Sequence, residues 1–424
     1  MFYSFASPIH IGAHWDQTEL MPRILVLDGH STAALTCVRA LGRNGFHVTL
    51  AYSSEHFAAS RFSRYVAHTD VYPSPEQDAP HFVEWLTVLL RARPFDLVIP
   101  MTDATIWPLS YNRLQFEGLT HLCLPPHTAL EQLNDKYHTV RIAQKLGIAV
   151  PRTLLITRIE ELETVRDWGF PLVMKDRFSI RWSDLGGISG GVVYAYSYED
   201  LVKAAQNRLQ LVRDVLVQEY VEGNGIGFSC FLINKQSHAP FQWRRLREKD
   251  PKGSGSSARI SEEISPLLRK GGESLLQAVG FEGIAMVEYK RSPQTGCYTL
   301  MEVNARPWGS IHLPVCCGIN YPLFLVEWFL HGKLPPTVVS YRKAITSRSL
   351  VGDLVFLENV WEGKPIGWPS AFPNFWWSLL KVAIPWYPGL RYEDISLADP
   401  MPGLAAFGNW MRRFLPHALA DSRH

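Results

Sequence analysis

The hydrophobic pattern of the first hundred residues alternates between short apolar runs and longer amphipathic segments. Helical periodicity covers residues 32–41 and residues 81–93. We place the end of the first helix at Gly42. Strands that alternate with helices predict a parallel, doubly wound sheet of Rossmann-like type. The apolar runs with the length of buried strands are residues 23–28, 47–51 and 95–99.

The turn after the first of these strands is the place where a dinucleotide would bind. It reads from Asp28 to Thr32 without a GxGxxG pattern, and no acidic residue ends the second strand. We therefore interpret this domain as a scaffold without its own NAD. Asp103 follows the third strand at the carboxyl edge where open α/β sheets bind ligands. It is a candidate substrate residue, with helix capping as the alternative.

A second pattern begins after Pro125 and Pro126. A helix is expected from Lys136 to Leu146, followed by a strand that ends at Lys175 and by the glycine-rich residues 184–191. Glycines lack a Cβ, so such a turn can bend over a phosphate and donate its N–H groups. Lys175 would add a point charge for the phosphates. A merely flexible hairpin is the alternative.

The next segments combine strands with a group of arginines. We expect residues 215–223 to form a strand, with residues 227–233 as its antiparallel partner. The turn-rich residues 251–257 follow the arginines and resemble a mobile loop. The arginines form either a clamp for a substrate carboxylate under that loop or a solvated face. They are Arg244, Arg245 and Arg247.

Residues 284–290 and 298–304 flank a turn-rich segment and predict a β-hairpin. Because strand side chains alternate between faces, Glu302 and Asn304 should share a face with Leu300. Glu288 joins them if the register allows, and two carboxylates with an amide oxygen suit Mg²⁺. Two residues after Asn304, an arginine adds a planar fork for phosphate or carboxylate. An exposed hairpin with ordinary polar residues is the alternative. The arginine is Arg306.

The composition changes after residue 336, where six of the 14 tryptophans occur. Residues 372–390 are aromatic but are interrupted by three prolines, so they neither span a membrane nor form one long helix. We expect this extension to pack on the main body. A surface that contacts a membrane peripherally is the alternative.

Charge and cysteine content narrow the class of protein. The 42 basic and 40 acidic residues give a net charge of +2, which favours neither nucleic acid nor an acidic membrane as a partner. The six cysteines form no CxxC pair, so we expect reduced thiols. The absence of a long apolar run and of a signal sequence predicts a cytoplasmic enzyme without a transmembrane segment. A homodimer is compatible with the sequence.

Taken in order, these motifs resemble the ATP-grasp superfamily, and most of all its carboxylate–amine ligase branch. The resemblance spans roughly residues 23–335 and is most specific at residues 302–306 and 308–310. It implies an ATP-grasp fold after a Rossmann-like domain, with a C-terminal aromatic-rich extension. The implied divisions are residues 1–125, 126–214, 215–336 and 337–424.

The resemblance also implies roles for individual residues. Lys136 and Lys175 would contact the phosphates of ATP, and Arg306 with Lys175 would act in catalysis. Glu222 would take the place of an acidic ribose ligand that many members carry, where this chain has a glycine-rich segment. The remaining nucleotide residues would be Gly186, Gly187, Ser189, Gly190, Gly191, Glu219, Tyr220 and Val221, and the ligands of Mg²⁺ or Mn²⁺ would be Glu288, Glu302 and Asn304.

The reaction implied by the resemblance joins a small carboxylate to an amine. ATP would activate the carboxylate as an acyl phosphate, and the amine would displace phosphate. The alternatives are an ATP-grasp enzyme of the carboxylase type and a nucleotide-binding protein without turnover. A membrane-associated scaffold is a third alternative, motivated only by the tryptophan-rich extension.

Overall fold

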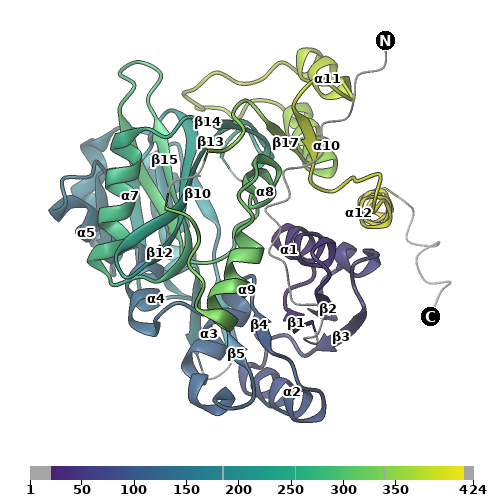
Figure 1. Ribbon diagram of the computed structural model, residues 1–424. Coiled ribbons are helices and arrows are strands. Elements are labelled where there is room, and N and C mark those ends of the chain that lie inside the picture. The colour runs from purple at the N-terminus through teal and green to yellow at the C-terminus, as the bar shows by residue number, and fades with distance from the viewer. Residues whose placement is uncertain (1–20, 184–185, 254, 338–339, 415–424) are drawn as a thin grey trace.

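Four β-sheets organise residues 21–183, 186–253, 255–337 and 340–414, which are the residues that the computed structural model describes (Figure 1). The first sheet has five parallel strands in the order β3-β2-β1-β4-β5. This confirms the predicted Rossmann-like sheet. Its strands are β1 (Arg23–Val26), β2 (His47–Ser53), β3 (His68–Tyr72), β4 (Leu97–Ile99) and β5 (His121–Leu122), and its helices are α1 (Thr32–Arg43), α2 (Ala79–Ala92) and α3 (Asp103–Tyr111).

Two local features of this domain are the end of helix α1 and the hydrogen bonds of Asp28. Helix α1 runs past Gly42 to Arg43, so the predicted end at Gly42 is one residue early. The glycine serves close packing instead, because a Cβ at Gly42 would overlap with Tyr65. Asp28 accepts hydrogen bonds from the backbone N–H of Met101 (2.8 Å) and of Thr102 (2.9 Å). Its carboxylate therefore ties the ends of β1 and β4 together.

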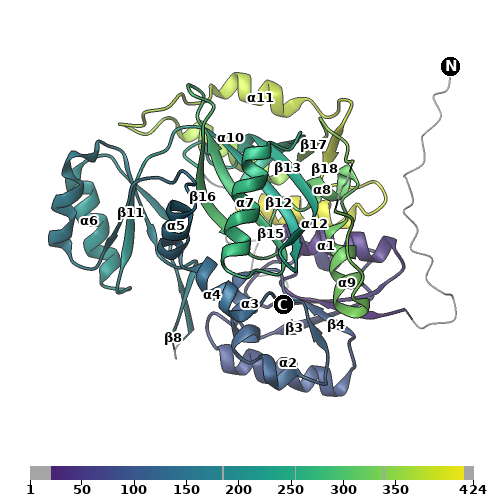
Figure 2. The ribbon, with the colours of Figure 1, turned by 60° about the vertical axis from the view of Figure 1, so that its left-hand side comes forward.

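The second sheet has four strands in the order β10-β7-β11-β6 and forms a lobe with α6 at one side of the molecule (Figure 2). A separate two-stranded sheet, β8 with β9, extends from it. The elements are α4 (His127–Asn134), α5 (Lys136–Lys145), β6 (Thr153–Ile156), β7 (Leu172–Asp176), β8 (Ile180–Ser183), β9 (Gly186–Ser189), β10 (Val192–Ala195), α6 (Tyr198–Leu209) and β11 (Val215–Glu219). The 3₁₀ helix η3 (Ile159–Trp168) lies between β6 and β7, whereas the 3₁₀ helices η1 (Ala59–Phe62) and η2 (Arg113–Phe116) belong to the N-terminal domain.

The third large sheet has seven strands in the order β16-β15-β12-β13-β14-β17-β18. Strand β12 pairs with β13 and β15, whereas β11 pairs with β6 and β7. The predicted pairing of residues 227–233 with residues 215–223 is therefore wrong. When two buried strands follow each other along the chain, their local sequence does not specify which strands they pair with. The elements are β12 (Asn224–Ile233), β13 (Gln236–Glu248), β14 (Ser256–Glu262), α7 (Pro266–Ala278), β15 (Gly283–Arg291), β16 (Tyr298–Asn304), α8 (His312–Cys317) and α9 (Tyr321–His331).

The chain after residue 336 is continuous with this sheet. Strand β17 (Thr346–Arg348) pairs with β14, and β18 (Leu390–Tyr392) pairs with β17. Helices α10 (Leu350–Glu362), α11 (Phe375–Ala383) and α12 (Met401–Arg412) accompany them. Figure 1 shows α12 beside the N-terminal helix α1.

The extension packs on the main body only in part. Trp368 is buried against Tyr194 and Tyr220, with ring centroids 5.3 and 5.4 Å away. Four other tryptophans of the extension are 67–71% exposed and take no part in this packing. They are Trp361, Trp376, Trp377 and Trp386.

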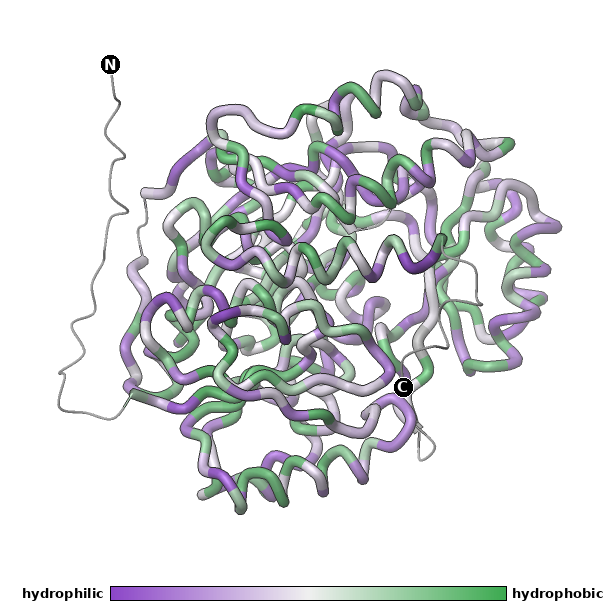
Figure 3. The backbone as a smooth tube through the Cα atoms, turned by 90° about the vertical axis from the view of Figure 1, so that its right-hand side faces the viewer, coloured by the Kyte–Doolittle hydropathy of each residue, from purple (hydrophilic) through white to green (hydrophobic). Residues whose placement is uncertain are grey.

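Hydrophobic side chains fill the interior between these layers. The outer helices alternate between green and purple along their length in Figure 3, as amphipathic helices do. Within the described ranges, no helix has both the length and the apolar character needed to cross a membrane. All six cysteines are free thiols.

Candidate active site

A cavity of about 550 Å³ lies between the four-stranded lobe and the seven-stranded sheet. The segments that line it come from all parts of the chain, from the start of α1 to the residue after β18. Most of the predicted site residues meet there: Lys136, Lys175, Gly190, Gly191, Glu219, Tyr220, Val221, Arg245, Glu288, Glu302, Asn304 and Arg306.

The predicted hairpin supplies the carboxylates of the cavity. Glu288 on β15 is paired directly with Glu302 on β16, so both side chains lie on one face of the sheet. A β-bulge at Met301 separates this pair from the next one, Tyr289 with Leu300. The bulge turns Leu300 to the opposite face, where it is buried in the core under α7, so the expected common face of Leu300 and Glu302 is wrong.

Opposite charges surround Glu302. Burial alone would raise the pKa of its carboxyl group, but the ammonium groups of Lys175 and Lys136 outweigh that effect and lower the pKa. Burial lowers the pKa of Lys175 to about 8 and also lowers the pKa of Lys136, whose Nζ donates to Ser179 Oγ at 3.1 Å. These two ammonium groups and this carboxylate are therefore placed to surround a charged ligand.

Glu288 has a different environment. It accepts a hydrogen bond from Arg245 Nη2 at 2.6 Å. Burial nevertheless raises the pKa of Glu288 to about 7. A cation that contacts this carboxylate would stabilise its charged form and would compete with Arg245 for it.

Arg306 is held from the N-terminal domain. Its Nε donates to Asp103 Oδ2 at 2.9 Å, and its Nη1 donates to the carbonyl oxygen of Pro307 at 3.1 Å. Asp103 is the first residue of α3 and does not itself line the cavity. A contact of Asp103 with substrate stays a prediction. In the structure, Asp103 orients the guanidinium of Arg306.

The glycine-rich segment forms strand β9 of the β8–β9 hairpin and continues into two glycines at the cavity. Residues 184 and 185 are outside the described residues, and the predicted Gly186, Gly187 and Ser189 belong to strand β9. The N–H of Gly187 donates to the carbonyl oxygen of Glu76 at 2.7 Å, which joins the hairpin to the N-terminal domain. Gly190 and Gly191 line the cavity.

The strand exit after β11 forms one end of the cavity. Lys290 Nζ donates to the carbonyl oxygen of Val221 at 2.8 Å and lies 5.1 Å from the ring centre of Tyr220. Lys290 is a residue that the sequence analysis missed, although it stands two positions after Glu288 on one strand. Glu219 pairs with Arg152 at 2.7 Å. Glu222 lies outside the cavity, where it accepts from Gln294 Nε2 at 3.1 Å.

Of the three arginines on β13, the cavity is lined by Arg245 alone. Arg244 pairs with Glu262 at 2.6 Å, and Arg247 Nε donates to Asp353 Oδ1 at 2.8 Å. Alternation turns Arg244 away from Arg245, and bulges in the pairing of β13 with β14 displace Arg247. Arg245 is therefore the one of these three arginines that lines the cavity, and its role as a carboxylate clamp stays a prediction.

Two glycines explain how β13 presents its side chains. A Cβ at Gly225 would overlap with the side chain of Arg245, and a Cβ at Gly227 would overlap with the indole ring of Trp243. These glycines let both side chains lie across strand β12. In this segment the sequence analysis notes glycines where many ATP-grasp members carry an acidic ribose ligand.

The sequence analysis also missed the far end of the cavity. Arg259 on β14 and Glu393, the residue after β18, both line it and pair with each other. Burial raises the pKa of the Glu393 carboxyl group. The two residues are 134 positions apart, so no local motif connects them.

The donor set fits a hard divalent cation. In the described part of the chain, no group of three or more His, Cys, Asp or Glu side chains is placed to hold a metal ion alone. Glu288, Glu302 and Asn304 supply oxygen atoms on one face of the hairpin, and Asn304 Nδ2 lies 3.4 Å from Glu302 Oε1. Phosphate oxygens would have to complete a six-coordinate shell of the kind that Mg²⁺ prefers.

Comparison with protein families and curated proteins gives partial matches. Residues 212–350 match a family described as ATP-grasp in the biosynthetic pathway with Ter operon. The chain is 28% identical over 188 residues to a carbamoyl phosphate synthase large chain of Methanobrevibacter smithii, covering 42% of this chain but 17% of that protein. It is 21% identical over 298 residues to a D-aspartate ligase of Enterococcus faecium, covering 65% of this chain and 69% of that protein.

Solved structures resemble a larger part of the chain. An L-amino acid ligase from Bacillus licheniformis has a TM-score of 0.56 at 19% identity and covers 74% of this chain and 75% of its own. The biotin carboxylase domain of a Hydrogenobacter thermophilus 2-oxoglutarate carboxylase, solved with MgADP and bicarbonate, has a TM-score of 0.59 at 14% identity. It covers 77% of this chain and 74% of its own. At these identities the likeness concerns the fold.

Proposed function

This chain is an ATP-grasp protein, and we propose that it is an ATP-dependent ligase that joins a small carboxylate to an amine. The predicted fold, a Rossmann-like sheet followed by the ATP-grasp sheets, is confirmed. The proposed products are an amide, ADP and phosphate. The amino-acid ligases among its relatives support this reaction class.

The observation that carries the proposal is the meeting of three charged groups in one cavity. Glu302 from the hairpin, Lys175 from the end of β7 and Arg306 after β16 line it together. These groups suit phosphoryl transfer, which depends on positioning and on neutralised charge more than on a nucleophilic side chain. Mg²⁺ bound by Glu288, Glu302 and Asn304 would neutralise phosphate charge.

In the first step, the substrate carboxylate attacks the γ-phosphorus of ATP. The bond to the β,γ-bridging oxygen breaks, and acyl phosphate and ADP form. Lys136 and Lys175 hold the phosphates, while the N–H groups of Gly190 and Gly191 close over them. The adenine ring of ATP lies at the end of the cavity formed by residues 219–221, where Lys290 fixes the backbone of Val221.

In the second step, the amine attacks the acyl carbon and phosphate leaves. A negative charge develops on the acyl oxygen in the tetrahedral intermediate. Arg306 is placed to stabilise that charge because Asp103 fixes its guanidinium in position. The attacking ammonium loses one proton to water before it attacks, and a second proton leaves its nitrogen for the departing phosphate as the intermediate collapses.

The proposal is tested by ATP-dependent phosphate release. Purified full-length protein with Mg-ATP is screened against pairs of amino acids and small carboxylates, and the coupled product is identified by mass spectrometry. The expected result is release that needs both substrates and forms an amide in equal amount to ADP.

Two other outcomes would point to the alternatives. ADP formation that needs bicarbonate would indicate a carboxylase, because the carboxylated product would then replace the amide. ATP binding without ADP formation across the whole panel would contradict the ligase and indicate a nucleotide-binding protein.

A further inference from the structure

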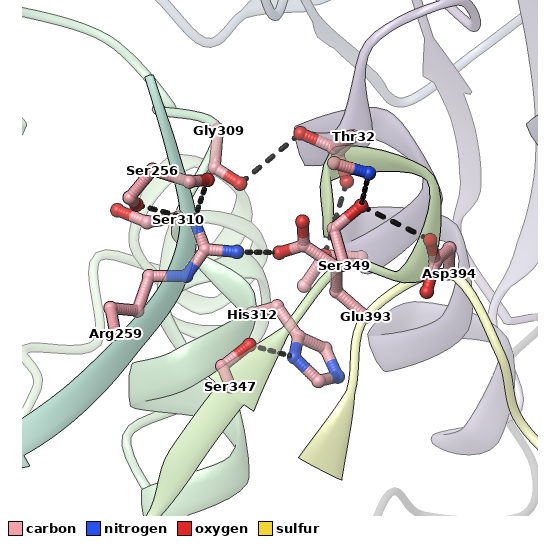
Figure 4. A network of polar contacts seen from close by, with 12 residues as sticks. Thr32, Ser256, Arg259, Gly309, Ser310, His312, Ser347, Ser349, Glu393 and Asp394 are labelled. Atoms are coloured by element: carbon pink, nitrogen blue, oxygen red, sulfur yellow. Dashed lines mark hydrogen bonds and ion pairs between the residues drawn. The ribbon is translucent and has the colours of Figure 1, made fainter. Parts of the chain in front are cut away.

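The cavity continues beyond the nucleotide and metal residues to a second group of charges. The charges are those of Arg259 and Glu393. The neighbouring uncharged residues that line the same part of the cavity are Ser256, Gly309 and Ser310. Figure 4 shows that they come from β14, from the segment after β16 and from the C-terminal extension. The extension therefore contributes Glu393 to the lining of the cavity.

The backbone of Glu393 is fixed so that its side chain faces Arg259. Its N–H donates to the carbonyl oxygen of Arg348 at 2.9 Å, and its own carbonyl oxygen accepts from Arg39 Nη1 at 2.7 Å. One carboxylate oxygen accepts from Arg259, and the other points away from the guanidinium (Figure 4). Glu393 is 4% exposed.

Arg259 has unused donor capacity. Its Nη1 donates to the Oγ and the carbonyl oxygen of Ser256, at 3.1 and 3.4 Å, and its Nη2 donates to Glu393. Its Nε is buried and has no hydrogen-bond partner among the described residues. Leaving a buried guanidinium N–H unmet is costly unless a ligand supplies the acceptor.

A second buried ion pair provides a contrast. Arg39 and Asp399 also join the extension to the main body, and the guanidinium of Arg39 uses Nε, Nη1 and Nη2 in hydrogen bonds of 2.7–3.2 Å. Neither residue lines the cavity. The Arg39–Asp399 pair therefore serves structure, whereas the Arg259–Glu393 pair faces space for a ligand.

The register of the sheet places Arg259 beside the reaction centre. Arg259 on β14 is paired with Arg245 on β13, and Arg245 contacts Glu288. Side chains of paired residues on adjacent antiparallel strands lie about 5 Å apart at their Cβ atoms. A ligand on Arg259 would thus have its other end within reach of the acyl phosphate.

We infer that Arg259 and Glu393 form the subsite of the amine substrate and that this substrate is an amino acid, an inference that rests on the proposed ligase function. A zwitterion offers the same two charges as the pair: its carboxylate meets Arg259, and its ammonium group meets the second oxygen of Glu393. Glu393 and Arg259 then determine specificity, and the C-terminal extension takes part in substrate selection.

The test begins with ligand analogues on the unaltered protein. Isothermal titration in the presence of Mg-ADP measures binding of the standard amino acids and of D-aspartate. The tightest binder is compared with its amide, which lacks the carboxylate, and with its deamino analogue, which lacks the ammonium group. The inference expects each analogue to bind at least tenfold more weakly, and equal binding of either one would overturn it.

Variants then locate the subsite. Glu393→Gln should weaken binding of that amino acid at least tenfold and raise its KM, while the Kd of ADP changes less than twofold. Asp399→Asn is the matched control, because it alters an equally buried carboxylate of the extension outside the cavity. If Glu393→Gln fails to fold, the double variant Arg259→Gln/Glu393→Gln removes both charges together and carries the same expectation. Unchanged amino-acid binding in a folded variant would overturn the assignment.

Trapping with hydroxylamine separates this inference from the ligase proposal. Hydroxylamine converts an acyl phosphate to a hydroxamate without needing an amino-acid subsite. Hydroxamate formation that persists in Glu393→Gln, with ligation to the amino acid reduced, supports both proposals. Persisting hydroxamate with undiminished ligation overturns the subsite alone. Absence of hydroxamate with every acid, together with lost amino-acid binding in Glu393→Gln, overturns the ligase alone.

Discussion

Glu288 and Glu302 are directly paired on adjacent antiparallel strands, and the bulge at Met301 keeps both carboxylates facing one cavity while Leu300 turns into the core. Two like charges in this position repel each other, and nearby cations offset that repulsion. Lys175 lowers the pKa of Glu302, and Arg245 contacts Glu288. The pair is thus arranged for a divalent cation and polyphosphate.

Replacing Glu302 with glutamine should reduce ATP-dependent ligation by two or more orders of magnitude. The change removes one charged oxygen ligand at the reacting phosphate, and loss of one such electrostatic contact typically costs about 10²–10³-fold. Initial rates at saturating Mg²⁺ measure the effect. Glu273→Gln, which alters a carboxylate paired with Arg269 on α7, is the control and should keep its activity. Near-normal turnover of Glu302→Gln would contradict the metal assignment.

Replacing Gly227 with alanine should destabilise the fold by about 1–3 kcal/mol, the usual cost of overpacking. The added methyl group would overlap with the indole ring of Trp243, which lines the cavity, so the KM for substrate should rise as well. Urea unfolding and steady-state kinetics measure the two effects. Gly408→Ala on α12 is the matched control: no atom lies within 4 Å of its added Cβ, so stability should be unchanged or slightly higher. Equal stability of both variants would show that Trp243 gives way without cost.

The kcat/KM for ATP should fall as the pH rises above about 8. Burial lowers the pKa of Lys175 to about 8, so its ammonium group loses its proton there and no longer attracts phosphate. The variant Lys175→Arg keeps its positive charge at these pH values. The fall of kcat/KM at alkaline pH should therefore shift to a pH more than one unit higher in this variant. An alkaline limb that stays in place in this variant would assign it to another group.

The same lysine has an effect of opposite sign on the stability of the ligand-free protein. Its folded pKa lies below the ordinary value of 10.5, so the folded state releases the proton first. The contribution of Lys175 to the free energy of unfolding should therefore increase as the pH rises from about 8 to 10.5. Denaturant titrations of the wild type and of Lys175→Met across this window measure the difference, which should grow in favour of the wild type as the pH rises.

Removing residues 337–424 should give an aggregating protein. The truncation deletes β17 and β18, leaves β14 as a long unprotected edge, and leaves Arg259 without Glu393. Light scattering and circular dichroism measure the outcome. A soluble, folded and fully active truncation would mean that the extension is an independent module.

Local sequence patterns were sufficient for the elements that carry most of the site. The hairpin of residues 283–304 follows from alternating side chains around a turn, and α5 follows from helical periodicity that begins at Lys136 and ends before Gly147. Strand β3 gave no such signal, because its residues are mostly exposed and polar. For the hairpin and for α5, the deciding interactions lie within a few residues of one another.

The sequence by itself determined the parallel N-terminal sheet, the hairpin that presents Glu288 and Glu302, and the lysines at Lys136 and Lys175, because periodicity, turns and strand ends are local properties. The tertiary structure decided which partner β12 takes, that Arg245 and not Arg244 faces the cavity, and that Glu393 meets Arg259 across 134 residues. Those outcomes depend on how whole strands are paired and buried, and the free energy of that pairing is shared among many distant side chains rather than encoded in any short segment.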